Sequence, residues 1–246
     1  MPLREEWEHN GNWLFRWRSY LPLLLFGLAL AGLYTFHLSQ QSEFSEEAWE
    51  ISCMGISFLG LGVRGLTIGF KPKGTSGGNT REQEAAVLNT TGTYSVVRHP
   101  LYLGNAIIWL GVSLFFHSWA MTLIVMLAFW IYYERIMFAE EEFLRNKFGE
   151  AYIAWASKTP AFIPRLGNWT AWGSAFSWKK VLGKEYAGFF GIIGTFCFLE
   201  IVQGLCYEHK LELEQPWRII LFSGALIYLI IRILKKYTHK LDVEGR

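Results

Sequence analysis

Charged side chains are scarce in this chain of 246 residues. Only 18% of the residues are Asp, Glu, Lys or Arg, whereas 52% are hydrophobic and 17% are aromatic. Soluble globular domains carry about 25% charged residues, so this composition excludes an ordinary soluble domain and favours a membrane protein. The net charge of +2 is small, and we expect no nucleic-acid partner.

Cysteines and known ligand motifs are also scarce. The three cysteines, Cys53, Cys197 and Cys206, lie in or beside apolar runs, without C-x-x-C spacing or a neighbouring His cluster. We therefore expect buried thiols, with no metal site and no disulfide. The Gly-rich segment 71–79 lacks the spacing of a Walker or dinucleotide-binding motif. The sequence contains no internal repeat and no low-complexity tract.

Long hydrophobic runs, in contrast, are plentiful. Six runs approach the ~20 residues that cross a bilayer as a helix, at residues 20–38, 49–70, 101–116, 119–134, 186–206 and 217–234. The sequence therefore predicts an all-α polytopic membrane bundle of about six spans. The third and fourth runs are short and separated only by His117-Ser118, so four full spans plus a hairpin is the alternative. The first run has no small-residue cleavage site, and we expect it to be retained.

The distribution of Lys and Arg predicts the orientation of the bundle, because these residues accumulate in cytoplasmic loops. They gather before the first run, after the second and after the fourth, whereas the loop 39–48 is acidic and 117–118 is uncharged. Both termini are therefore predicted to be cytoplasmic. The two long polar segments, 71–99 and 135–185, are predicted to lie on the same side and to carry the chemistry.

A short surface helix is predicted just before the third run. Thr80-Arg-Glu-Gln83 has the form of a capping box, and Gly92 stands where a C-terminal cap would, so the prediction covers residues 81–90. Its end would bring Asn89 close to the motif that follows.

The segment Arg98-His99-Pro100 places polar groups at the mouth of the third run, where such groups are costly and usually functional. The residue before a proline avoids the α region and proline suits the first helical position, so a helix is predicted to begin at His99-Pro100. Its free amides, with the charge of Arg98, would make an anion site. Tyr94 would add an aromatic face, while Tyr102 and Gly104 lie on the first turn.

A second helix is predicted to continue past the fourth run, over residues 134–149, with Gly149 at its end. At 100° per residue, Glu141 falls within the apolar stripe formed by Met137, Leu144 and Phe148. A carboxylate in such a stripe must be paired or bound. Glu142 points away, and we expect it on a solvated face.

Together these groups indicate a small zwitterionic ligand that carries a ring. Glu140 and Glu141 could accept ribose hydroxyls or an ammonium group, and aromatic side chains could hold a base ring or a sulfonium. S-adenosylmethionine has this set of groups, and a nucleotide is equally compatible with the residues alone.

The motifs are also similar to those of a known family. Arg98-His99-Pro100-x-Tyr102-x-Gly104, then Glu140-Glu141-x-x-Leu144-x-x-x-Phe148-Gly149-x-x-Tyr152, then Pro160 and Pro164, resembles the integral membrane methyltransferases of the isoprenylcysteine carboxyl methyltransferase and phospholipid methyltransferase group. The resemblance implies an S-adenosylmethionine site closed by cytoplasmic helices, with lipid entering from the bilayer. It implies cofactor contacts from Asn79, Asn89, Tyr94, His99, Pro100, Leu101, Tyr102, Gly104, Glu140 and Glu141.

The resemblance also divides the chain. It implies a two-span region at 1–74, a methyltransferase core at 75–165 and a two-span extension at 166–246. The amino-acid sequence of the core is most similar to bacterial members that methylate the 1-phosphate of lipid A, which implies an inner-membrane location. Such an anionic acceptor needs a cation to position it. We expect Arg98 and Arg135 to act in catalysis. For binding the substrate, Arg135 is the first candidate and Arg64 is the second.

Four alternatives remain open at this stage. Within the class, the acceptor could be an isoprenylcysteine carboxylate, or a phospholipid amine that needs a carboxylate or histidine to take its proton. A nicotinamide-dependent membrane reductase of the sterol-reductase type would use a related scaffold. A scaffold or small transporter would bind no cofactor.

Overall fold

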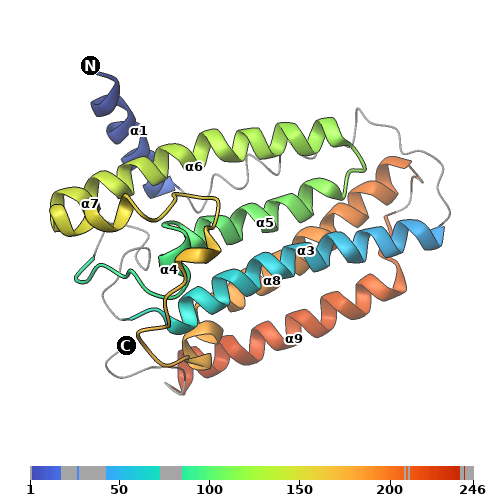
Figure 1. The fold of residues 1–246 in the computed structure, drawn as a ribbon. Helices are drawn as coiled ribbons and strands as arrows, with labels where there is room; N and C mark the ends of the chain where they lie inside the picture. The colour runs from blue at the N-terminus through green and yellow to red at the C-terminus, as the bar shows by residue number, and fades with distance from the viewer. Residues whose placement is uncertain are drawn as a thin grey trace.

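The computed structural model describes residues 2–17, 27, 43–72, 85–207, 209, 211–238 and 241. Within these residues the chain is helical and contains no strand (Figure 1). The elements are α1 (Leu3–Trp17), α3 (Glu43–Phe70), α4 (Thr93–Val96), α5 (Pro100–Leu114), α6 (Trp119–Phe148), α7 (Glu150–Ala156), the short 3₁₀ helix η1 (Leu166–Asn168), α8 (Trp178–Tyr207) and α9 (Gln215–Tyr237). The predicted all-α membrane bundle is confirmed.

Four of these helices, α3, α6, α8 and α9, are long and apolar enough to cross a membrane. Helix α5 is apolar but has 15 residues, which gives about 22 Å of helix against a hydrocarbon core of about 30 Å. It joins α6 through a tight turn in which Ser118 caps α6 by accepting a hydrogen bond from the Met121 amide. The third and fourth runs thus form a helical hairpin, but only α5 is short and α6 is long enough to be a full span, so the two runs match neither alternative completely. The predicted first span, 20–38, lies almost entirely outside the described residues.

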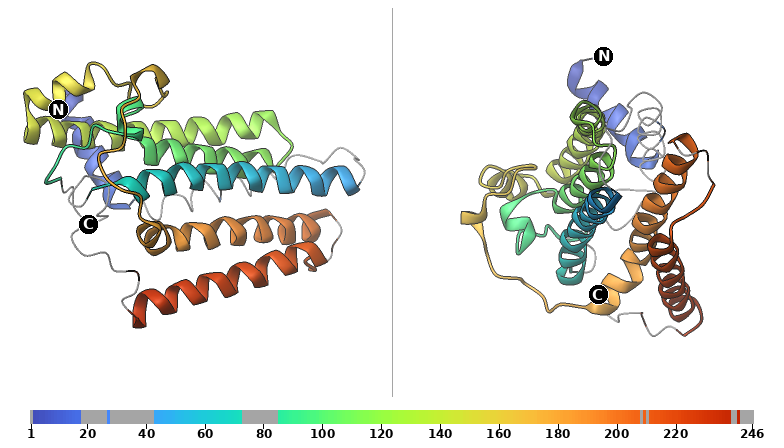
Figure 2. Two further views of the ribbon diagram at one scale, coloured as in Figure 1. Left: turned by 60° about the horizontal axis from the view of Figure 1, so that its bottom comes forward. Right: turned by 90° about the vertical axis from the view of Figure 1, so that its right-hand side faces the viewer.

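The long helices lie side by side, each packed against the next (Figure 2). Contacts run from α1 to α6, α5, α3, α8 and finally α9. Two apolar clusters fill the row: one surrounds Phe115, Phe196 and Trp217, and the other surrounds Phe129 and Ile136. Large apolar side chains remain exposed on the outer faces, and α9 is the clearest case. That exposure suits helices surrounded by lipid.

Helices α3 and α5 cross at two glycines. A Cβ atom on Gly60 would lie 2.5 Å from the Gly104 carbonyl oxygen, and one on Gly104 would lie 2.5 Å from the Cγ atom of Arg64. The backbones are therefore too close for any side chain at either position. Gly104 serves this crossing and leaves room for Arg64.

Residues 157–177, called the strap below, fold back over the start of α5 (Figure 1). The amides of Arg98 and His99 donate to the carbonyls of Pro160 and Ala161, at 2.9 and 3.2 Å. Farther along, the ring of Trp172 stacks on Phe70 with 4.0 Å between centroids. The strap thus ties α3, α4 and α5 together at one end of the bundle, where α7 also lies.

The predicted surface helix at 81–90 is wrong over its described part. Residues 85–90 are not helical, and 81–84 lie outside the described residues. Ala85 is almost fully buried against Leu144 and Tyr152. An extended course lets this segment line the neighbouring pocket, and that tertiary contact outweighs the local capping signal.

The predicted solvated position of Glu142 is also wrong. Its side chain is 5% exposed, and it accepts a hydrogen bond from Arg4 of α1 in an ion pair that also includes Arg145. Helix α1 covers this face of α6, and the approach is so close that a Cβ atom on Gly11 would overlap the Arg135 carbonyl. Because α1 covers it, Glu142 is buried and paired with Arg4 and does not face solvent.

Candidate functional site

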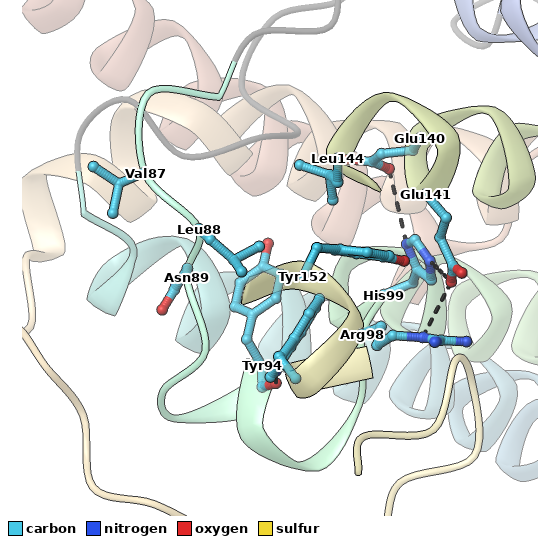
Figure 3. A pocket seen from close by; sticks show the side chains of 11 residues that line it. Val87, Leu88, Asn89, Tyr94, Arg98, His99, Glu140, Glu141, Leu144 and Tyr152 are labelled. Atoms are coloured by element: carbon cyan, nitrogen blue, oxygen red, sulfur yellow. Dashed lines mark hydrogen bonds and ion pairs between the residues drawn. The ribbon is translucent and has the colours of Figure 1, made fainter. Parts of the chain in front are cut away.

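A pocket opens at the end of the bundle where α4, α5, α6 and α7 meet (Figure 3). Its volume is about 380 Å³ when the space open to solvent at its mouth is included. Its walls come from the segment before α4, from the start of α5, from the end of α6 and from α7. The lining residues are Val87, Leu88, Asn89, Tyr94, Arg98, His99, Glu140, Glu141, Leu144, Tyr152 and Trp155.

The start of α5 is built as the sequence predicts. His99 is the N-cap residue and Pro100 the first helical residue. The His99 carbonyl accepts hydrogen bonds from the amides of Tyr102 and Leu103, while the amides of Arg98 and His99 donate to the strap. The amides of these four residues therefore already donate to carbonyls. An anion bound here would be held mainly by side chains.

Four charged or titratable side chains meet on one wall of the pocket. The Nε2 atom of His99 lies 2.9 Å from Oε1 of Glu141, and the Nε atom of Arg98 lies 3.1 Å from the same oxygen. The Nδ1 atom of His99 lies 3.8 Å from Glu140 Oε2. Figure 3 shows His99 between the two carboxylates, with Arg98 beside Glu141. Because a carboxylate only accepts, Nε2 must carry a proton.

Glu140 is held from behind by Tyr102. The Tyr102 hydroxyl donates to Oε2 of Glu140 at 3.0 Å, and its ring stacks against His99 at 5.6 Å between centroids. Both His99 and Glu140 are buried, with side-chain exposures of 5% and 8%. Tyr102 thus fixes the wall without lining the pocket itself.

Gly149 sends α7 back over the pocket. Its φ of 52° lies in the left-handed region, where glycine carries no steric penalty, and its amide closes α6 on the Arg145 carbonyl. The chain then turns into α7, so that Tyr152 and Trp155 face the pocket. Trp155 donates from Nε1 to the Tyr94 carbonyl at 3.1 Å, which joins α7 to α4.

Two phenols in the pocket remain hydrogen-bond donors. Burial, with the charge of Glu141, raises the pKa of Tyr152, and burial, with the charge of Glu140, raises the pKa of Tyr94. The buried Tyr152 hydroxyl lies close enough to Glu141 for a weak hydrogen-bond interaction that contributes to the raised pKa, but the contact does not reach the geometry of a full hydrogen bond. A buried donor of this kind is costly unless a ligand completes it.

Asn89 approaches the pocket from the non-helical segment before α4. Its Oδ1 atom accepts hydrogen bonds from the amide and hydroxyl of Thr91, each at 3.2 Å. These bonds fix the turn into Gly92, whose φ of 60° would strain any other residue. The Asn89 amide nitrogen has no part in these bonds.

The arrangement fits a small zwitterionic ligand with a ring. Glu140 and Glu141 provide acceptors, the two tyrosines provide donors, and Trp155 with Leu88 and Leu144 provides apolar walls. Among the described residues, no group of three or more His, Cys, Asp or Glu side chains has an arrangement that could hold a metal ion.

The structure brings together six of the predicted site residues and places the other described ones elsewhere. Asn89, Tyr94, Arg98, His99, Glu140 and Glu141 line the pocket, whereas Pro100, Leu101, Tyr102 and Gly104 lie outside the lining on α5. Asn79 lies outside the described residues. The Arg135 guanidinium stacks 3.8 Å above the Trp7 ring of α1. Arg64 pairs with Glu185 of α8.

Five lining residues were not predicted as site residues from the sequence: Val87, Leu88, Leu144, Tyr152 and Trp155. Tyr152 belongs to the motif but carried no assigned role, and Trp155 was not considered. The spacing offers a signal for Trp155, because residues three apart on a helix share a face. Val87 was hidden by the incorrect helix at 81–90.

Comparison with known proteins gives a matched segment that contains all the lining residues of the pocket except Tyr152 and Trp155. Residues 57–151 match the model of a family described as phospholipid methyltransferase. The cobalt-zinc-cadmium resistance protein CzcN of Cupriavidus metallidurans is 31% identical over 139 residues, which is 54% of this chain and 64% of that protein. The nickel-cobalt-cadmium resistance protein NccN of Alcaligenes xylosoxydans xylosoxydans is 30% identical over 118 residues, 48% of this chain and 55% of that protein.

A third relative is named for its reaction. The protein-S-isoprenylcysteine O-methyltransferase of Schizosaccharomyces pombe is 35% identical over 80 residues, 32% of this chain and 34% of that protein. The chain thus spans less than two thirds of the length of these relatives. No solved structure matches the chain. These matches support the resemblance to the integral membrane methyltransferases.

Proposed function

We propose that this protein transfers a methyl group from S-adenosylmethionine to a membrane lipid at the cytoplasmic face of a bacterial inner membrane. The observation that carries the proposal is the Arg98–His99–Glu141 cluster in a pocket beside membrane-spanning helices. The family match over 57–151 and the relative named as an O-methyltransferase support the same reaction.

The cofactor, when bound, supplies an activated methyl group on a sulfonium. The protein then has to hold the donor and acceptor in line and keep water away, and needs no nucleophilic side chain. Glu140 and Glu141 can accept hydrogen bonds from ribose hydroxyls or the ammonium group. Tyr94 and Trp155 can pack against the base ring or the sulfonium, and Tyr152 can donate to a carboxylate.

For the acceptor, we propose an anionic oxygen, which is already ionised at neutral pH and needs no base. A lipid phosphate such as the lipid A 1-phosphate is our first candidate, and an isoprenylcysteine carboxylate is the second. The three arginines predicted to act on the substrate or in catalysis are engaged: Arg98 with Glu141, Arg64 with Glu185 and Arg135 with Trp7. A phosphate would therefore have to draw one of these arginines away from its partner. Arg135 would lose the least, because it would leave an aromatic ring and not a carboxylate.

Cofactor binding tests the site directly. Purified protein should bind S-adenosylmethionine in calorimetry, and both His99→Ala and Glu141→Gln should weaken binding at least about tenfold, the effect of losing a charge-assisted hydrogen bond of about 1.5–3 kcal/mol. Glu150→Gln, an exposed carboxylate on α7, is the matched control and should bind normally. Normal binding by both site variants would refute the assignment, and tight binding of NADPH instead would favour a reductase.

The chemistry of the product identifies the acceptor. Protein incubated with labelled S-adenosylmethionine and total lipid extract should give labelled lipid. A carboxyl methyl ester releases labelled methanol in mild alkali, whereas a phosphate methyl ester and a methylated amine retain the label. Mass spectrometry of the retained fraction then separates phosphate from amine, and methanol release would overturn the phosphate proposal.

A further inference from the structure

A buried ion pair joins α3 to α8 below the pocket. The Arg64 guanidinium makes two hydrogen bonds to the Glu185 carboxylate, at 2.9 and 2.7 Å. Side-chain exposures are 23% for Arg64 and 7% for Glu185. Arg64 lies six residues before the end of α3 and Glu185 seven residues after the start of α8, so both sit about 10 Å along their helices from the same end of the bundle.

The pair continues toward the cofactor wall. A third nitrogen of Arg64 donates to Asn105 Oδ1 at 2.7 Å, and the Asn105 amide donates to the Tyr133 hydroxyl at 2.9 Å. The Tyr133 ring packs against Tyr102 at 5.1 Å between centroids. Tyr102 in turn donates to Glu140, which lines the pocket. An unbroken set of contacts therefore runs from α8 through α3, α5 and α6 to the pocket.

The two halves of this ion pair come from different parts of the chain. Arg64 lies within the segment that matches the family model, whereas Glu185 lies 34 residues beyond its end at residue 151. Gly104, a residue of the Arg-His-Pro motif, leaves room for the Arg64 stem. An arginine inside a membrane helix requires a partner, and here the extension provides it.

We propose that Glu185 is a positioning residue of the pocket, acting through Arg64, Asn105 and Tyr133 on Tyr102 and Glu140. The inference rests on the proposed function, because it treats Glu140 as part of the cofactor site. If Glu185 has this role, α8 is a functional part of the methyltransferase. Arg64 then acts as a positioning residue and does not contact the substrate.

The test compares the affinity for S-adenosylmethionine with the midpoint of thermal unfolding, both measured on the full chain in detergent. Glu185→Gln and Asn105→Leu should each weaken binding about fivefold, a typical size for coupling through packed contacts. Asn105→Leu leaves the ion pair in place and removes only the hydrogen bonds of Asn105, so its unfolding midpoint should fall less than that of Glu185→Gln. Glu200→Gln, a carboxylate nearer the far end of α8, is the control and should bind normally.

The double variant Arg64→Met/Glu185→Met separates positioning from simple stability. Replacing a buried pair by apolar side chains is often neutral for stability, so the unfolding midpoint should return to near the wild-type value while binding stays weak. Recovery of binding together with stability, or normal binding by Asn105→Leu, would overturn the positioning role. If the wild-type protein binds no S-adenosylmethionine, the proposed function fails first and this inference fails with it.

Discussion

At the scale of single residues, Glu141 and Glu142 differ most from what their adjacency suggests. Glu141 faces His99 and Arg98, whereas Glu142 faces Arg4 of α1. One helical step of 100° separates the two directions. The apolar stripe predicted the inward direction of Glu141. Nothing local to Glu142 indicated that α1 would cover it, because that contact joins positions 138 residues apart.

The Tyr152 hydroxyl yields a prediction in which stability and binding move in opposite directions. Tyr152→Phe removes a buried donor that makes no well-formed hydrogen bond to a described residue, so the cofactor-free protein should become more stable by about 1 kcal/mol. If that hydroxyl completes its hydrogen bond with the ligand, the same variant should bind S-adenosylmethionine about three to ten times more weakly. Thermal unfolding with and without the cofactor measures both effects.

Val87→Ala is a suitable companion variant, because Val87 also lines the pocket but its side chain is 53% exposed and offers no polar group. It should change neither quantity greatly. A loss of stability in cofactor-free Tyr152→Phe would mean that the hydroxyl is already satisfied within the protein, and would remove the argument for a ligand contact.

At the scale of elements, the crossing of α3 and α5 explains why α3 carries a glycine at position 60. Gly60 lies against the backbone of α5, whereas nothing lies within 4 Å of a Cβ placed on Gly62. Gly60→Ala should therefore force the helices apart and destabilise the protein by about 1–3 kcal/mol. The lowered midpoint of thermal unfolding in detergent measures this cost.

Gly62→Ala is the matched control for that experiment. It introduces the same methyl group two residues away on the same helix, into open space, and replaces a poor helix former by the best one. It should be neutral or stabilising. Equal destabilisation by the two variants would show that the close crossing at Gly60 is not the cause, because helix propensity favours alanine at both positions.

The elements that could be predicted from sequence are those with a local cause. Pro100 fixes the start of α5, and Gly149 fixes the break between α6 and α7, because each residue restricts its own backbone. The helix predicted at 81–90 had only capping signals behind it. Burial of Ala85 beneath α6 and α7 decides that segment instead, and the sequence carries no mark of that contact.

At the scale of the whole molecule, the candidate site depends on parts of the chain that the motif does not contain. The strap holds Arg98 and His99 through their amides, and part of it lies beyond residue 165, where the predicted core ends. Trp172 lies so close to Gly92 that any Cβ there would overlap its ring. We therefore propose that the core and the extension form one functional unit, since the second half of the strap belongs to the extension.

Helix α4, helix α7 and the strap gather at one end of the bundle (Figures 1 and 2). This arrangement makes the predicted orientation testable with the native cysteines. Cys206, near the opposite end of α8, is exposed, whereas Cys53 and Cys197 are buried. A membrane-impermeant thiol reagent should therefore label the wild-type protein in spheroplasts, and Cys206→Ser should abolish that label.

The reverse pattern is expected at the pocket end. Lys158 lies at the start of the strap and is exposed, so the double variant Cys206→Ser/Lys158→Cys should react only in inverted membrane vesicles. This follows from the excess of Lys and Arg in 135–185, which should keep that segment cytoplasmic and give the pocket access to a soluble cofactor. Labelling of Lys158→Cys in intact spheroplasts would place the pocket outside, away from cytoplasmic S-adenosylmethionine, and would contradict the orientation and the proposed reaction together.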